Sequence, residues 1–380
     1  MNPRRILFIA EGQLGDLLLL TPAIRAMKET FPSSSISVLI VERRGSGRSD
    51  HGIESASGAV QKLLHESDSV LSTSPHIDEI LVVNRVAMRS LRGFARVRSE
   101  FNVVRFLRAQ RFDIVISTFP EDRFAVWSLA SGASVRVGQH DQGLSWLLTH
   151  RPKIKKHDRG VLEYYCELAR TVGAKVTSAR TEYVVPSASQ VWVQNFLEQH
   201  GLDGMIRLVA VHPGATGNYK IWPPDRYAAL IDFLQSETGA RVVLCNGVHD
   251  RAIVDQIRSR LHTTVVEADT GTNTGNLGAL LSRCSLCISN DSGPRHLAVA
   301  VGTQSLAFFR QFHEQEWGVY VESETLQILQ AKTPCPACPP RVCLDKLSGG
   351  ETFGCSCLRM IGLDQAKLQS AKMLAFLENK

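Results

Sequence analysis

Residues 5–16, RILFIAEGQLGD, join a short apolar run to a glycine-containing turn and a carboxylate. Because the apolar run stops at Glu11, it is too short to span a membrane and is typical of a buried strand. Similar runs at residues 36–41, 80–83 and 114–117 alternate with helical patterns at residues 17–29, 89–110, 123–130 and 160–171. This alternation predicts a parallel, doubly wound α/β sheet.

The same rhythm begins again after a polar stretch at residues 177–190, so we expect a domain boundary near Pro186. Strand-like runs follow at residues 208–211, 242–245, 286–289 and 305–309, with helical patterns between them. The sequence therefore predicts two Rossmann-like domains, residues 1–186 and 187–332, that face each other across a cleft. Residues 333–380 are expected to form a cysteine-rich loop and a C-terminal helix.

The composition is that of an ordinary globular protein. Of 380 residues, 44% are hydrophobic and 21% are charged, which excludes disordered, collagen-like and coiled-coil proteins. The net charge of +6 is compatible with a phosphate-bearing partner or an anionic membrane surface, but it is too small to indicate nucleic acid. With no nucleic-acid motif and no targeting segment recognised, we expect a cytoplasmic protein that can associate peripherally with the inner membrane.

The first candidate for chemistry is the turn that contains Gly12, Gly15 and Asp16. Glycines there let the backbone turn sharply and approach a ligand closely. A carboxylate at the start of the following helix could accept a proton from a substrate hydroxyl. The alternative interpretation is that Asp16 only caps the helix and complements its dipole.

Two loops of the second half are candidates for phosphate binding. Residues 212–220, HPGATGNYK, combine small residues with one cation, Lys220, as a diphosphate site requires. Residues 290–296, NDSGPRH, place Ser292 and Gly293 at a helix start, where free amides can bind an anion. Asp291 is then expected to orient amides or to contact a sugar hydroxyl. Either loop could instead be an ordinary connection, and His296 an ordinary buried histidine.

Five of the nine cysteines lie between Cys335 and Cys357. Without a secretion signal, such clustering favours metal ligands over disulfides, and four thiolates are typical of structural zinc. An unmetallated loop or a redox pair remains the alternative.

A helical pattern with many arginines covers residues 85–111, which contain eight arginines and a single acid, Glu100. Apolar residues at helical spacing make this pattern amphipathic. Such a helix can lie on an anionic membrane surface, or it can simply present a solvated face.

Taken together, the loops resemble glycosyltransferase family 9, the lipopolysaccharide heptosyltransferases and their relatives. The resemblance covers nearly the whole chain and rests on these segments: 6–9 (ILFI), 12–16 (GQLGD), 21–26 (TPAIRA), 31–32 (FP), 212–214 (HPG), 220–223 (KIWP) and 290–298 (NDSGPRHLA). It implies a GT-B fold and an inverting, metal-independent transfer, most often from ADP-heptose to a saccharide or lipid-linked acceptor.

The resemblance also implies roles for particular residues. Asp16 stands where the family's proposed catalytic base stands, and Gly12 and Gly15 lie beside it on the acceptor half. The donor side would comprise Gly214, Thr216, Lys220, Asp291, Ser292, Gly293 and His296. The preferred zinc ligands are Cys335, Cys338, Cys343 and Cys357, with Cys355 extra.

The sequence departs from the family at Ala10, where many members carry a basic residue, and at Arg295, where methionine is more frequent. The first difference bears on the identity of the acceptor and sugar more than on the reaction class. Two alternatives are a nucleotide-sugar epimerase on the same fold and a non-enzymatic, zinc-bearing GT-B module.

Overall fold

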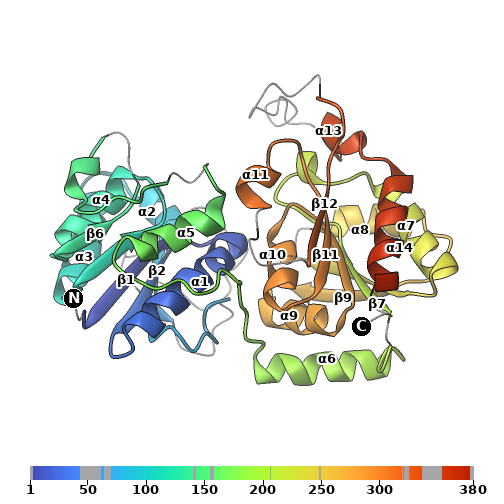
Figure 1. The fold of residues 1–380 in the computed structure, drawn as a ribbon, viewed down its shortest axis with the longest axis horizontal. Helices are drawn as coiled ribbons and strands as arrows, with labels where there is room; N and C mark the ends of the chain where they lie inside the picture. Colours follow the sequence, from blue (N-terminus) through green and yellow to red (C-terminus); the bar gives the residue numbers. More distant parts are fainter. Residues whose placement is uncertain are drawn as a thin grey trace. The chain divides into compact units, whose positions relative to one another are not determined.

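The chain forms two units, Met1–Thr181 and Glu182–Lys380, each built around its own sheet (Figure 1). The computed structural model describes residues 3–42, 61–63, 70–139, 143–154, 158–205, 207–247, 250–318, 320, 325–335 and 353–376. The polar stretch that predicted a linker begins in the first unit, and Pro186 lies just inside the second. The described residues of the C-terminal segment, 333–335 and 353–376, fall within the second unit.

The N-terminal sheet has the strand order β3-β4-β2-β1-β5-β6. All its neighbours are parallel except β3, which is antiparallel to β4. The strands are β1 (Arg5–Glu11), β2 (Ser35–Glu42), β3 (Gln61–Leu63), β4 (Glu79–Asn84), β5 (Ile114–Ser117) and β6 (Val135–Val137). The helices are α1 (Leu14–Thr30), α2 (Arg85–Ser90), α3 (Gly93–Ala109), α4 (Asp122–Ala130) and α5 (Val161–Arg170), with a 3₁₀ turn η1 (Ser145–Leu147).

The strands of this sheet are apolar on both faces because helices cover both. Alternate residues of β1, β2 and β4, such as Leu7 and Leu39, pack against α2, α3 and α4 in one cluster. Residues of opposite parity, such as Ile6 and Phe8, are equally buried, and α1 packs against α5. A continuous Val/Ile/Leu run is what a parallel strand buried on both faces requires.

The C-terminal sheet is entirely parallel and has the order β9-β8-β7-β10-β11-β12, which is the 3-2-1-4-5-6 order of a Rossmann fold. Its strands are β7 (Leu208–His212), β8 (Arg241–Gly247), β9 (Val266–Gly271), β10 (Leu286–Asn290), β11 (Gln304–Phe308) and β12 (Leu326–Leu329). Its helices are α6 (Ser187–Gln199), α7 (Pro224–Glu237), α8 (Arg251–Arg258), α9 (Thr274–Arg283), α10 (Gly293–Ala300), α11 (Glu314–Trp317), α13 (Ser356–Arg359) and α14 (Leu363–Phe376), with a 3₁₀ turn η2 (Asn218–Lys220).

One large apolar cluster joins the strands of this sheet to the C-terminal segment. Trp222 and Phe308 stack at its centre with ring centroids 4.1 Å apart. Helix α14 packs against α7, so the predicted C-terminal helix belongs to the core of the second unit (Figure 1). Cys335, Cys355 and Cys357 are buried in the same cluster.

The predicted helix over residues 89–110 is wrong in one respect, because the structure has two helices there. The backbone is extended at Leu91 and at Arg92, and Gly93 then begins α3 with φ +54°. Four strands, β3, β6, β9 and β12, were not predicted. Within the described part of the chain, no helix is both long and apolar enough to cross a bilayer.

Candidate active site

The turn after β1 lies at the point where the N-terminal sheet reverses its strand order. Strand β1 is flanked by β2 and β5, and ligands of open α/β sheets bind at the carboxyl ends of strands at such a point. Gly12 donates its amide to the carbonyl of Val41 at 3.1 Å, and a Cβ there would lie 3.1 Å from Ile40 Cγ2. Gly12 thus lets this turn cross closely over the end of β2.

Asp16 is the third residue of α1 and not its cap, because Gln13 occupies the N-cap position. Its side chain is buried, and the Tyr165 hydroxyl donates a hydrogen bond to Asp16 Oδ1 at 3.1 Å. Burial and the charge of Asp16 raise the pKa of Tyr165 well above its usual range. Tyr165 therefore stays protonated and keeps donating to the carboxylate.

A second charged pair lies at the same edge of this sheet. Arg85 follows β4 directly, and its Nη1 contacts Glu121 Oε2 at 2.8 Å in the loop after β5. Arg85 is buried, so this ion pair is shielded from solvent. Arg85 was counted in the arginine-rich pattern of residues 85–111, but it is buried and does not belong to an exposed face. Glu121 was not predicted as a site residue.

The second unit also reverses its strand order between two strands, β7 and β10. The two loops singled out as phosphate candidates follow these two strands, so the structure brings them together. Asn290 joins them, since its Nδ2 donates to the carbonyl of Pro213 at 2.6 Å. Its Oδ1 accepts from the amide of Trp222 at 2.9 Å and from the Tyr227 hydroxyl at 3.0 Å. Asn290 is fully buried, and its role is to fix the shape of the 213–222 loop.

The predicted donor residues of the first loop differ in their surroundings. A Cβ on Gly214 would lie 2.0 Å from Asp250 Oδ1, so this glycine is required for packing. Thr216 is exposed and Lys220 is half-buried at the end of η2, so both can meet a ligand. The charge of Lys220 lowers the pKa of both Asp291 and His296.

Asp291 is buried and is surrounded by cationic groups. Arg295 Nη2 donates to its Oδ1 at 3.1 Å, and His313 Nδ1 lies 3.5 Å from its Oδ2. Burial raises the pKa of Asp291, but the hydrogen bond from His313 and the charges of Arg295 and Lys220 outweigh it, so the pKa lies well below its usual range. Asp291 is therefore a permanent anion that holds its neighbours in place. Ser292 is the N-cap of α10 and, with Gly293, is half-buried.

His296 is neutral and its tautomer is fixed by its partners. Arg295 Nη2 donates to His296 Nε2 at 2.6 Å, so the ring proton resides on Nδ1, which meets the Tyr320 hydroxyl. Burial, and then the charge of Arg295, lower the pKa of His296 well below its usual range. This histidine is buried, and its hydrogen bonds join Arg295 to Tyr320.

Arg310 was missed by the sequence analysis. It follows β11 and is 5% exposed; its guanidinium carbon lies 5.0 Å from the centre of the Tyr219 ring. Its Nη2 donates to His313 Nε2 at 2.7 Å, which leaves the Nδ1 proton of His313 directed at Asp291. Arg295 thus contacts Asp291 directly, Arg310 reaches it through His313, and the charge of Lys220 acts on the same carboxylate. This surplus of positive charge suits a diphosphate.

The cysteine prediction is tested only in part. Cys335 and Cys357 are buried, whereas Cys338 and Cys343 lie outside the described residues. The Sγ atoms of Cys355 and Cys357 are 3.2 Å apart. Cys355, which was expected to be extra, therefore lies directly beside the predicted ligand Cys357. Among the described residues, no three His, Cys, Asp or Glu side chains gather as a metal site.

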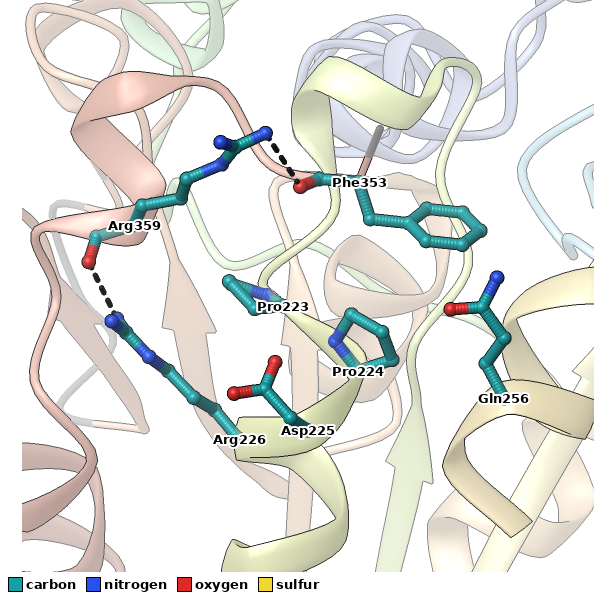
Figure 2. Close-up of a pocket in the computed structure, with 7 residues that line it drawn as sticks. All are labelled: Pro223, Pro224, Asp225, Arg226, Gln256, Phe353 and Arg359. Atoms are coloured by element: carbon teal, nitrogen blue, oxygen red, sulfur yellow. Dashed lines mark hydrogen bonds between the residues drawn. The ribbon is translucent and has the colours of Figure 1, made fainter. Parts of the chain in front are cut away.

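A pocket of about 500 Å³ opens beside the loop that carries Lys220, where α7 begins (Figure 2). Its lining residues are Pro223, Pro224, Asp225, Arg226, Gln256, Phe353 and Arg359. Arg226 donates to the carbonyl of Arg359 at 2.6 Å, and Arg359 donates to that of Phe353 at 3.4 Å. None of the predicted donor residues lines this pocket.

Two Rossmann-like units, one with a buried carboxylate and one with a cationic, phosphate-suited loop pair, are the parts of a GT-B fold. The sequence matches the profile of glycosyltransferase family 9 (heptosyltransferase) over residues 101–346, more than half of the chain. The chain belongs to this family and is a glycosyltransferase. The family membership therefore disfavours the epimerase and the non-enzymatic module.

Individual relatives agree with this assignment. The chain is 25% identical over 301 residues to lipopolysaccharide heptosyltransferase 3 of Escherichia coli, covering 78% of this chain and 80% of the relative. A family 9 glycosyltransferase from Veillonella parvula superposes with a TM-score of 0.74 at 20% identity, covering 98% and 97% of the two chains. The E. coli ADP-heptose lipopolysaccharide heptosyltransferase II superposes with a TM-score of 0.70 at 18% identity, covering 98% and 99%. The predicted GT-B fold is confirmed.

Proposed function

We propose that this protein transfers a heptose from ADP-heptose to a saccharide of the lipopolysaccharide core, with inversion and without a catalytic metal. The heptose and the lipopolysaccharide acceptor come from the names of its relatives, and the ADP-heptose donor from that of the E. coli heptosyltransferase II. The observation that carries the proposal is the cationic network of Lys220, Arg295 and Arg310 at the strand-order reversal of the second unit.

The donor diphosphate is proposed to bind where the loops after β7 and β10 meet. Lys220 and Thr216 would contact the phosphates, and the half-buried start of α10, at Ser292 and Gly293, would offer free amides. Arg310 would add a second cation beside Tyr219. Asp291 would hold Arg295 and His313 in place, because its carboxylate already contacts both. His296 would hold Arg295, because its ring already bonds to Arg295 and to Tyr320.

Asp16 is proposed to be the general base. The acceptor hydroxyl would lose its proton to the Asp16 carboxylate as its oxygen forms a bond to the anomeric carbon of the donor. The bond from that carbon to the diphosphate would break at the same time, and ADP would leave with the electron pair. Cations around the diphosphate stabilise this developing negative charge.

The experiment is a transfer assay with the whole protein, ADP-heptose and a lipopolysaccharide-core acceptor, reading ADP release and product mass. Replacing Asp16 by asparagine keeps the shape of the side chain but removes the base. We expect kcat to fall about 10²- to 10⁴-fold while the Kd for ADP stays unchanged. Full activity of the Asp16→Asn variant would refute the role of Asp16. Activity with a UDP- or GDP-linked sugar alone would instead refute the donor.

Structural zinc at Cys335, Cys338, Cys343 and Cys357 is a separate proposal, supported by the burial of Cys335 and Cys357. Cys355 competes with Cys357 as a ligand, because its Sγ atom is 3.2 Å away. Elemental analysis of the purified protein should find about one zinc per chain, the number that four thiolates hold. The Cys335→Ser variant should lose it, and absence of zinc from protein purified without chelator would end this proposal.

A further inference from the structure

The outer face of α3 exposes large apolar side chains to solvent. Phe94, Val97 and Phe101 are 80%, 65% and 61% exposed, respectively. They recur at three- and four-residue spacing, so they form one stripe along the helix. Burying side chains of this size removes apolar area from water, which is favourable. Their exposure together on one helix face is therefore a sign of a binding surface.

The inner face of the same helix packs against the core of the N-terminal unit. Ser99, Val103 and Leu107 are buried, and Val103 and Leu107 belong to the cluster that packs on the sheet. These residues recur every four positions on the side of α3 opposite the stripe. The apolar stripe is thus not needed to hold α3 in the fold.

Cationic side chains surround this stripe. Six exposed arginines lie on α2, on α3 or between them, namely Arg89, Arg92, Arg96, Arg98, Arg105 and Arg108. Of these, Arg98, Arg105 and Arg108 follow Phe94 or Phe101 by four or seven positions and so lie on the face of the stripe. Within the described parts of the chain, none of the six forms an ion pair with a carboxylate. The one acid of the helix, Glu100, is turned away, since it binds Arg123 and accepts from Trp127 Nε1 at 3.3 Å. The exposed face is therefore apolar and strongly positive, with no acid to offset the charge.

We propose that this face of α3 binds the surface of a bilayer that contains anionic lipids. Phenylalanine and valine side chains would enter the boundary between headgroups and acyl chains, while the arginines would contact lipid phosphates. A nucleic acid would match the charge but would leave the apolar stripe in water. An acidic protein surface would match both features only if it carried a complementary apolar patch. The combination of an apolar stripe with an uncompensated arginine border fits an anionic lipid surface best.

The topology of the N-terminal unit gives this contact a direction. Strands β4, β2, β1 and β5 all run in the same direction. Helix α2 begins directly after β4 and α3 ends shortly before β5, so α3 leads back from the carboxyl edge of the sheet to its amino edge. The first turn of α3, with Phe94, therefore points toward the carboxyl edge of the sheet. Asp16 lies at that same edge, after β1. Binding through Phe94 would bring this edge of the unit toward the lipid surface.

The test is co-sedimentation of the whole protein with vesicles of phosphatidylcholine alone and with vesicles that also contain phosphatidylglycerol. We expect binding to the second kind only, weakening as salt is raised. The variant Phe94→Ser/Phe101→Ser should lose at least tenfold in affinity. The variant Arg98→Gln/Arg105→Gln should lose about fivefold for each arginine. As a matched control, Val191→Ser/Leu368→Ser removes two side chains of similar exposure from α6 and α14 and should bind as the wild type does.

Several outcomes would overturn the proposal. They are failure of the wild type to bind anionic vesicles, equal binding to both kinds of vesicle, and equal losses in the control and in the α3 variants. Dimerisation that Phe94→Ser/Phe101→Ser abolishes, in a protein that binds no vesicles, would assign the face to a second copy of the chain. Binding to duplex DNA without binding to vesicles would assign it to nucleic acid. The two α3 variants change only exposed side chains, and circular dichroism checks that each is folded.

Discussion

Tyr165 donates its hydroxyl proton to Asp16 Oδ1 at 3.1 Å, although the two residues are 149 positions apart in the chain. Both side chains are buried, and Tyr165 lies on α5, which packs against the helix that carries Asp16. A hydrogen bond to the charged form of a carboxyl group stabilises that form. Tyr165 therefore holds the Asp16 carboxylate in one position, as a base that must accept a proton from a sugar hydroxyl requires.

The first prediction concerns this hydrogen bond. In the Tyr165→Phe variant the carboxylate loses the bond that fixes its position, so kcat should fall about two- to tenfold, the loss expected for one hydrogen bond. The Kd for ADP should not change, because Tyr165 lies in the other unit from the proposed donor loops. The measurement is kcat for the wild type and the variant at the same pH. An identical kcat for both proteins would show that Tyr165 does not act on the catalytic group.

Much of the fold could be predicted from the sequence because its strands are buried on both faces. Runs such as 36–41 and 286–289 contain almost no polar residue, and each occurs as a strand of a parallel sheet. Strands β3, β6, β9 and β12 were missed because they are short or carry polar residues, as in Val266–Gly271. The break at Leu91 and Arg92 was missed because both residues fit a helical pattern, and only Gly93 hinted at it.

The candidate site could be predicted only where a glycine or a charged residue directly follows a strand. That signal found the loops of Asp16, Lys220 and Asp291. It gave no indication of Tyr165, which lies in the middle of an amphipathic helix and is distinguished only by its tertiary contact. Arg310 does follow β11, but it carries no neighbouring glycine pattern, and its position beside Tyr219 depends on the shape of another loop.

The second prediction tests the two cations proposed to bind the donor diphosphate. The Lys220→Met and Arg310→Met variants should each bind ADP about 10- to 100-fold more weakly, as expected for losing a charged hydrogen bond. Their affinity for AMP should fall less, because AMP has one phosphate fewer. Calorimetric titration measures both ligands, and Arg251→Gln, an exposed arginine of α8, is the matched control. Equal losses for ADP and AMP would argue that these residues act on folding and not on the diphosphate.

The third prediction concerns the support that the C-terminal segment gives to the Lys220 loop. Gly354 donates its amide to the carbonyl of Asn218 at 2.9 Å, and Cys355 donates to that of Tyr219 at 3.1 Å. Gly354 has φ +78°, and a Cβ there would lie 3.0 Å from the carbonyl oxygen of Ile221. Alanine at this position costs roughly 1–2 kcal/mol in the left-handed region alone. The Gly354→Ala variant should therefore displace η2 and weaken ADP binding.

The control for this variant is Gly362→Ala in the same segment, because a Cβ there meets nothing within 4 Å. It should bind ADP like the wild type. If both glycine variants bind ADP normally, the contact between the C-terminal segment and the Lys220 loop has no part in donor binding.

The fourth prediction follows from two buried histidines of the second unit. Burial lowers the pKa of His212 and, with help from the charge of Arg295, that of His296. Both are therefore neutral in the folded state at a pH where they are protonated in the unfolded chain. The unfolded state binds more protons, so the free energy of unfolding should fall as the pH is lowered below about 6.5. The slope is at most about 1.4 kcal/mol per pH unit for each histidine.

The titration of Asp291, in the same network, does not overlap with that of the two histidines. The pKa of Asp291 lies below its usual range, so its contribution to stability is lost only below about pH 4, the ordinary pKa of an aspartate. Urea unfolding between about pH 5 and 7.5 thus isolates the histidines. The His296→Gln variant should show a shallower dependence on pH than the wild type. The His262→Gln variant, on an exposed turn, should keep the wild-type slope. A wild-type stability that does not change over this range would show that the two histidines are not buried as neutral groups.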